Sequence, residues 1–214
     1  MKAEKTVLPP IMYRTRLSRR ELEEYAANDL AFYEVDLSRI STIFLDWVCF
    51  FYKERKLHSH LITREIKILD AGLIASKTKE ASPFRSKRSP LNGLMHKHFT
   101  DARFIRENIA IHHRNKMGNN ESLVHKINKL KQSGLSHDQA IKKTVHQVIE
   151  GYTERDDANE LTGEWIVYQE HEGNKYYLTI GLHEEDDINI CERVLEAYKT
   201  DLPFLPKLGG LQNA

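Results

Sequence analysis

The most apolar stretch of the chain, ISTIFLDWVCFFY, runs from Ile40 to Tyr52 and constrains the fold more than any other segment. It is too short to cross a bilayer, because a spanning helix needs about 20 apolar residues, and it contains Asp46. We therefore predict a buried core helix that ends near Lys56. The chain of 214 residues is long enough to surround such a helix with one core, or with one core and a small satellite.

Helix start and stop signals fill the chain between residues 18 and 151. SRRE (Ser18 to Glu21) and SHDQ (Ser136 to Gln139) are capping boxes, and Gly72 is a helix stop. A helix near Thr100 and another after the second capping box follow from their apolar spacing. The second of these helices is expected to bury the apolar residues Ile141, Val145, Val148 and Ile149.

The pattern changes to that of strands after residue 162. The segment EWIVYQEHEGNKYYLTIGLH predicts strands near 164–171 and 175–183, joined by a two-residue turn at Gly173–Asn174. With that turn the core face consists of Trp165, Val167, Leu178, Ile180 and Leu182. The opposite face is partly apolar as well, so we expect another element to cover it.

These patterns together predict an α+β fold. Residues 1–151 form a mainly helical region, and residues 152–214 form a small region with an antiparallel hairpin and a C-terminal helix, DDINICERVLEAY. We expect the second region to pack on the first. Within the first region lies the clearest irregular segment, residues 76–93, where prolines, serines and a glycine interrupt the periodicity.

Charge is distributed unevenly although the formal net charge is only +1. Residues 77–131 contain 13 Lys and Arg against 4 Asp and Glu, whereas residues 150–201 contain 4 against 15. The basic middle would attract a phosphate backbone and the acidic end would repel one. Alternatively, the two blocks face each other inside the fold or contact a protein partner.

Four of the eleven histidines lie in HKHFTDARFIRENIAIHHRN, residues 96–115. Histidine suits general acid–base catalysis because its ordinary pKa lies near neutrality. Arginine suits phosphate because its planar fork donates two hydrogen bonds at once. The candidate catalytic residues are His96, His98, His112 and His113. The candidate nucleic-acid-binding residues are Arg85, Lys87, Arg88, Arg103, Arg106 and Arg114.

The same histidines also permit a metal site. His58 with His60, and His96 with His98, are His-x-His pairs, which on a strand would offer two imidazoles to one ion. Lys56 and Lys97 lie beside these pairs and disfavour a bound cation. We therefore predict no metal ligand and no cofactor, and we keep a His-ligated metalloenzyme as an alternative.

The segment GEWIVYQEHEGNKYYLTIGLHEEDDINICERV resembles segments of uncharacterised bacterial proteins associated with mobile elements. Its hairpin also resembles the last strands of small ribonuclease toxins of the barnase and RelE type. The resemblance covers about a quarter of the chain. It implies a toxin-like ribonuclease.

The sequence therefore predicts a protein that engages RNA or DNA, with metal-independent RNA cleavage by histidine acid–base chemistry as its activity. A non-catalytic protein that binds a partner through its acidic C-terminal region is the main alternative. The two cysteines, Cys49 and Cys191, have no metal-type spacing, and the first residues lack a secretory apolar segment. We expect a cytoplasmic protein that does not associate with membranes.

Overall fold

A computed structural model describes residue 15 and residues 17–55, 57–72, 76–100, 104–105, 108–109, 123–161, 163–182 and 185–207. Over these residues 54% are helical and 16% lie in strands, which confirms the α+β class. The helices are α1 (Arg19–Ala27), α2 (Thr42–Arg55), α3 (Ser59–Ala71), α5 (Leu123–Gln132), α6 (His137–Asp157) and α7 (Asp187–Thr200), with short 3-10 helices η2 (Leu30–Phe32) and η3 (Leu37–Arg39). The strands are β1 (Ser82–Pro83), β2 (Met95–Phe99), β3 (Glu164–His171) and β4 (Asn174–Gly181).

The chain divides into two compact units. Unit 1 contains residues 1–76, 80–99 and 163–214, and unit 2 contains residues 77–79 and 100–162. The division differs from the expected boundary after residue 151, because the C-terminal hairpin belongs with the N-terminal helices. Residue 151 itself lies inside α6.

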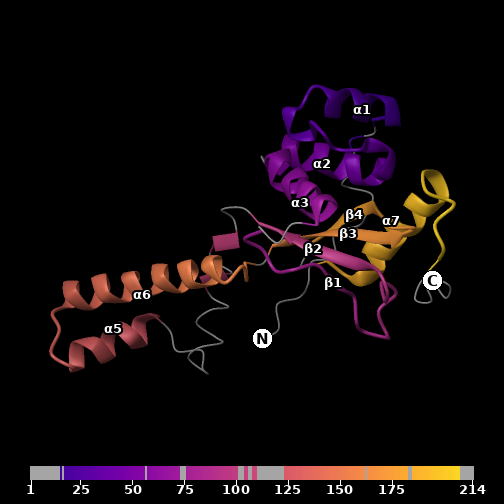
Figure 1. Cartoon of the computed structure of the whole chain (residues 1–214). Helices are drawn as coiled ribbons and strands as arrows, with labels where there is room; N and C mark the ends of the chain where they lie inside the picture. Colours follow the sequence, from indigo (N-terminus) through magenta and orange to yellow (C-terminus); the bar gives the residue numbers. More distant parts are fainter. Residues whose placement is uncertain are drawn as a thin grey trace. The chain divides into compact units, whose positions relative to one another are not determined.

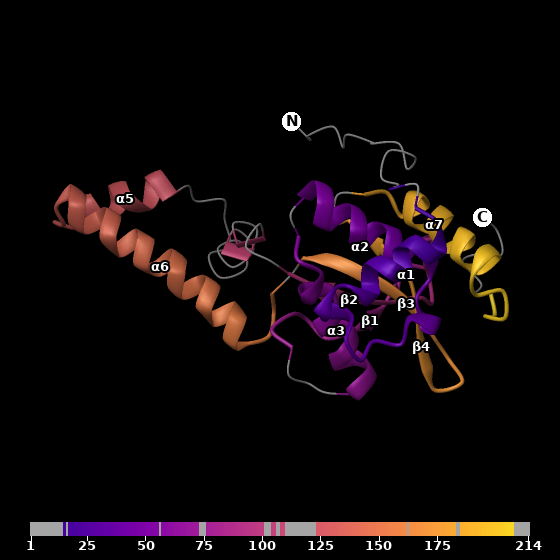
Figure 2. The same ribbon diagram turned by 90° about the horizontal axis from the view of Figure 1, so that it is seen from above.

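The centre of unit 1 is an antiparallel sheet in the order β1-β2-β3-β4 (Figure 1). Helices α1, α2 and α3 cover one face of the sheet, as the view from above shows (Figure 2). Helix α7 packs on the other face. The hairpin therefore has an apolar core on both sides, which confirms the expectation that another element covers its second face.

Helix α2 contains the apolar run and lies in the larger core cluster. Phe44, Leu45, Val48 and Cys49 are each at most 1% exposed. The Oγ of Ser41 accepts a hydrogen bond from the backbone N–H of Phe44 (3.0 Å) and donates one to the carbonyl of Leu178 in β4 (2.6 Å). The first turn of the helix is thus fixed to the sheet, which confirms the predicted core helix.

The predicted helix ends are largely confirmed. Ser18 and Glu21 form the reciprocal capping box of α1, and Ser136 and Gln139 form that of α6. Gly72 ends α3 in the left-handed conformation, with φ of 64°. Of the helix expected from Thr100, the structure describes Phe104, Ile105, Asn108 and Ile109, all in helical conformation.

The predicted register of the hairpin is wrong. The turn uses Glu172 and Gly173, which both have positive φ (48° and 78°), and His171 pairs with Asn174. A bulge follows, because Val167 pairs with Thr179 while Tyr168 pairs with Tyr177, so that Leu178 is the additional residue.

The predicted core face is wrong for the same reason. The bulge moves Leu178 and Ile180, which we expected on one face, to opposite sides of the sheet. Leu178 packs with Val167 in the cluster around α7, whereas Ile180 packs in the cluster around α2.

Unit 2 contains the helical hairpin of α5 and α6. The face of α6 that is buried carries Ala140, Thr144, Gly151 and Arg155. Ile141, Val145 and Ile149, which the sequence predicts to be buried, are 37%, 51% and 57% exposed. Their prediction is wrong because the side of this helix that is buried is the one that carries Ala140, Thr144, Gly151 and Arg155, and not the side with the branched apolar residues. None of the helices described in either unit has the length and apolar composition needed to cross a membrane.

Candidate functional site

Strand β2 positions the two histidines that come first in the His-rich segment. Successive side chains of a strand point to opposite faces, so His96 and His98 share one face of the sheet. In the register with β3, His96 lies opposite Val167, and His98 lies opposite Trp165. The sequence did not predict this strand, whose central residue is a lysine.

The two histidine rings belong to an aromatic cluster. The ring of Phe84 lies 4.6 Å from that of His96, and the rings of His96 and His98 lie 5.6 Å apart, measured between centroids. The ring of Trp165 lies 5.5 Å from His96 and 6.3 Å from His98. We call Phe84, His96, His98 and Trp165 the histidine–aromatic cluster.

The two histidines differ in exposure. His98 is only 6% exposed, and its Nδ1 lies 3.0 Å from the carbonyl oxygen of Gly163 and 3.3 Å from the amide nitrogen of that residue. His96 is half-buried, and its Nε2 lies 3.5 Å from the Oγ of Ser82 in β1. The backbone therefore orients His98, while His96 is the more accessible of the two.

Lys97 points to the opposite face of β2, where it is 3% exposed. Its Nζ donates a hydrogen bond to the Oγ of Ser76 (3.0 Å) and lies 3.5 Å from Oε2 of the buried Glu65 in α3. The hydroxyl of Ser76 in turn donates to the same carboxylate oxygen (2.6 Å). Burial lowers the pKa of Lys97, and the nearby Glu65 carboxylate opposes this shift. This ion pair connects α3 to the strand that carries His96 and His98.

The loop between β1 and β2 places three of the predicted cations at the surface. Arg85, Lys87 and Arg88 are exposed, and none of them has a carboxylate within ion-pair distance among the described residues. Figure 1 shows the loop leaving the sheet between the two strands. The cations are thus available to an anion from outside.

Turns and two buried leucines give this loop a defined shape. The backbone N–H of Ser89 donates to the carbonyl of Ser86, and that of Leu94 donates to the carbonyl of Leu91. Leu91 and Leu94 are fully buried in the cluster around α7. The Oγ of Ser89 also donates to Asp187 at the start of α7 (2.5 Å).

The other predicted site residues are not brought into this arrangement. His112, His113, Arg103, Arg106 and Arg114 lie outside the described residues. His58 and His60 lie at the start of α3, far in sequence from β2, and their rings are 5.7 Å apart and exposed. Within the described ranges no group of three or more His, Cys, Asp or Glu side chains is placed to hold a metal ion.

The two charge blocks meet at few ion pairs in the described part of the chain. Lys77 of the basic block lies 3.3 Å from Asp156 of the acidic block. Other acidic residues pair with cations of their own block, as Glu185 does with Arg193 and Glu160 with Arg155. Mutual neutralisation therefore does not account for the exposed cations of the β1–β2 loop.

Sequence reasoning missed the buried ion pairs. A signal for one of them exists, because Ile62, Glu65, Ile66 and Leu69 have the spacing of a single helix face. A carboxylate on an apolar face needs a buried cation or hydrogen-bond donors. Nothing in the local sequence identifies Lys97 as that cation.

Comparisons with known proteins identify no relative of this chain. No family model, no curated protein and no solved structure matches the chain.

Proposed function

We propose that the chain binds single-stranded nucleic acid through the β1–β2 loop and through the Phe84 and Trp165 rings of the histidine–aromatic cluster. The observation that carries the proposal is the loop itself, in which Arg85, Lys87 and Arg88 are exposed and have no carboxylate within ion-pair distance among the described residues. Phe84 begins this loop and belongs to the cluster. The loop cations are therefore adjacent in the chain to Phe84, whose ring lies 5.5 Å from that of Trp165.

This combination of cations and aromatic rings is better suited to binding single-stranded nucleic acid than a duplex. Cations neutralise the phosphates, and the π-face of an aromatic ring stacks with any base that is not already paired. Phe84 and Trp165 are both partly exposed, so part of each ring is accessible. A single strand can present phosphates and bases to the same surface, which a duplex cannot do without unpairing.

The proposal extends to cleavage of RNA without a metal. Cleavage of a phosphodiester requires one group that removes the 2′-hydroxyl proton and another that protonates the leaving oxygen. His96 and His98 lie on one face of β2 with their rings 5.6 Å apart, a separation that suits two groups acting on one phosphate. The cations of the loop would stabilise the additional negative charge in the transition state. His112 and His113 stay predictions for the same role.

Binding is tested by the salt dependence of affinity for a fluorescent single-stranded RNA. The variant with Arg85→Ala, Lys87→Ala and Arg88→Ala should have a slope of log affinity against log salt that is flatter by about 2, because each lost contact contributes about 0.7. A control variant that also loses three positive charges has alanine at Lys175, Lys199 and Lys207. Its slope should equal that of the wild type. Equal slopes in all three proteins would contradict the proposed surface.

Cleavage is tested in the presence of a metal chelator with two conservative variants. Asn at position 98 can keep the hydrogen bond that Nδ1 makes with Gly163, and Gln at position 96 can keep the contact that Nε2 makes with Ser82. Both His98→Asn and His96→Gln should bind RNA as the wild type does and lose cleavage. Cleavage that survives in both variants, or that requires a metal, would refute the histidine mechanism and leave the binding proposal to its own test.

A further inference from the structure

Helix α6 has an exposed apolar ridge in addition to the side that it buries. Ile141, Val145 and Ile149 follow one another at intervals of four residues and are 37%, 51% and 57% exposed. Residues at this spacing lie on one side of a helix. The half-buried Val148 and Tyr152 lie next to the ridge. The ridge covers nine residues, with about 12 Å of helix between the first and the last.

The ridge has the same composition when it is read in either direction. Val145 is at its centre, with a branched isoleucine four residues before it and another four residues after it. A two-fold rotation about an axis through Val145 therefore places Ile141 of one copy against Ile149 of the other. An interface between identical subunits related by a two-fold axis requires such self-complementarity.

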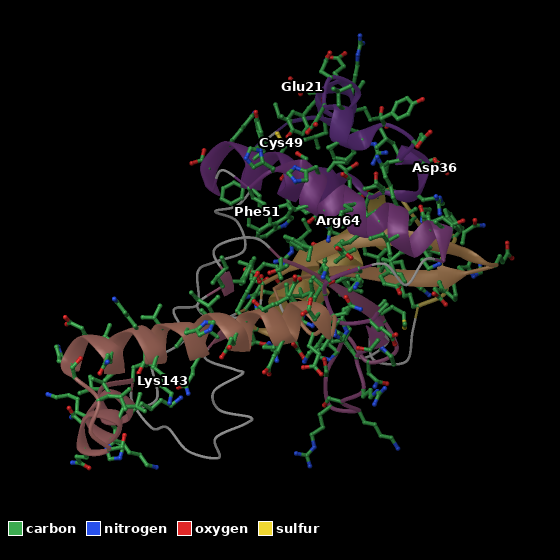
Figure 3. The ribbon with its side chains drawn as sticks, turned by 60° about the vertical axis from the view of Figure 1, so that its left-hand side comes forward. Glu21, Asp36, Cys49, Phe51, Arg64 and Lys143 are labelled. Atoms are coloured by element: carbon green, nitrogen blue, oxygen red, sulfur yellow. The ribbon has the colours of Figure 1, made fainter. Side chains whose placement is uncertain are left out.

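The charges of the helical hairpin are distributed unevenly along α6, with positive charge towards its start and negative charge towards its end. The exposed cations Lys129, Lys131, Lys142 and Lys143 all lie on α5 or on the first half of α6. Lys143 projects from α6 in Figure 3. The first half of α6 also carries Asp138, and the second half carries Glu150, Glu154, Asp156 and Asp157 together with Arg155. The net charge therefore changes from +1 in the first half of α6 to −3 in the second half, although not all of these side chains lie beside the ridge. Antiparallel pairing brings the basic half of one copy against the acidic half of the other, whereas parallel pairing would bring like charges together.

We propose that α6 packs antiparallel against α6 of a second copy of this chain, with the two-fold axis near Val145. The apolar ridge supplies the contact, and the charge polarity selects the direction. Unlike the surface proposed for nucleic acid, this interface lies in unit 2, so that it stands or fails independently of the proposed function.

Cysteine cross-linking of the full chain tests the pairing directly. The native Cys49 and Cys191 are buried and should not react. Val145→Cys should form a disulfide-linked dimer on mild oxidation, because the two copies of position 145 face each other. Glu154→Cys lies on the side of α6 opposite to the ridge and should remain monomeric on a non-reducing gel.

The direction of pairing is tested with two further cysteine variants. One of them carries an affinity tag, so that its homodimer, the other homodimer and the heterodimer differ in mass. Ile141→Cys and Ile149→Cys should each cross-link poorly alone and efficiently when mixed, giving a heterodimer of intermediate mass. Cross-linking of each variant with itself, and not with the other, would mean parallel pairing and would overturn the proposal.

Sedimentation equilibrium of the unmodified protein provides the second measurement. Val145→Glu places two carboxylates at the axis and should raise the dimer dissociation constant about 100-fold or more. The side chain of Val145 is half exposed within the chain, so the circular dichroism of the variant should match that of the wild type. A wild-type chain that stays monomeric up to about 100 µM, where a dimer with a micromolar dissociation constant would be largely formed, would overturn the proposal.

Discussion

The guanidinium of Arg193 is the most connected charged group in unit 1, and its removal should be costly. It forms a two-pronged ion pair with Glu185, in which Nη2 lies 2.8 Å from Oε2. It also donates to the hydroxyl of Thr179 (3.1 Å) and to the carbonyl of Ile180 (2.9 Å). Its Cζ lies 4.5 Å from the ring centroid of Trp47. One side chain thus joins α7, β4 and α2.

We predict that Arg193→Met lowers the free energy of unfolding by about 3–5 kcal/mol, the usual cost when one partner of a buried ion pair is removed. The reason is the group left behind, because the side chain of Glu185 is only 11% exposed and would keep its charge without a cation. Glu185→Gln removes that charge and retains an acceptor for the backbone N–H of Leu182. The double variant should therefore be less destabilised than the sum of the two single variants, by about 1.5 kcal/mol or more.

Urea unfolding of the wild type, both single variants and the double variant measures this coupling. Arg193→Lys is the matched control, since it keeps the charge but cannot form the two-pronged pair, and it should lie between the wild type and Arg193→Met. Additive effects within about 0.5 kcal/mol would refute the reasoning, because independent sites add to that accuracy.

Three further predictions concern the hairpin and the buried tyrosines. Glu172→Asn should stabilise the protein by about 0.5–1 kcal/mol in urea unfolding, because Asn adopts positive φ more readily and Asn-Gly is the favoured turn; a loss of stability would mean that the turn lies elsewhere. Gly181→Ala should lower the free energy of unfolding by about 1–3 kcal/mol, because the new Cβ would lie 2.9 Å from Cδ1 of Ile190. Addition of Ile190→Val should restore part of this loss, and a loss that stays unchanged in the double variant would exclude that clash. Stability should fall as the pH rises above the ordinary tyrosine pKa of 10.0, because burial raises the pKa of five tyrosines, to about 12 in one case, and the folded state holds protons that the unfolded chain releases. Absorbance that shows all nine tyrosines ionised near pH 10 without unfolding would contradict this result. Four of the five tyrosines have large shifts of their pKa. The four are Tyr25, Tyr168, Tyr177 and Tyr198.

The features that the sequence predicted correctly are those that depend only on residues close to one another in the chain. The capping boxes at Ser18 and Ser136 and the stop at Gly72 each depend on neighbours at most four positions away. The hairpin shows the limit of this approach. Gly173–Asn174 is the more favourable turn by local preference, yet the chain places Glu172 at positive φ, because the side chains of both strands then reach the cores on the two faces.

Features that depend on distant partners were not predictable from one sequence. Strand β2 has lysine at its centre, and the carboxylate of Glu65, 32 positions earlier, compensates for the burial of that charge. The same applies to the candidate site. The histidines and cations were identified by residue type, but the ring contacts of His96 with Phe84 and Trp165 depend on the pairing of β2 with β3.

The pairing of β2 with β3 also has a consequence for the order of events during synthesis. Phe99 lies opposite Glu164, although 64 residues, most of unit 2, separate them in the chain. At about 5–20 residues per second, a ribosome needs roughly 3–13 s to add this segment. During that interval β2 has no neighbour on its β3 side, and the apolar faces of α2 and α3 have no complete sheet to pack on.

Because transiently exposed apolar surface is what chaperones bind, we predict that the growing chain binds them until β4 emerges. Replacement of residues 100–162 by a short glycine-rich linker would remove the delay, since a shorter loop costs less entropy to close. Unit 1 produced in this form should therefore fold faster than the same unit within the full chain.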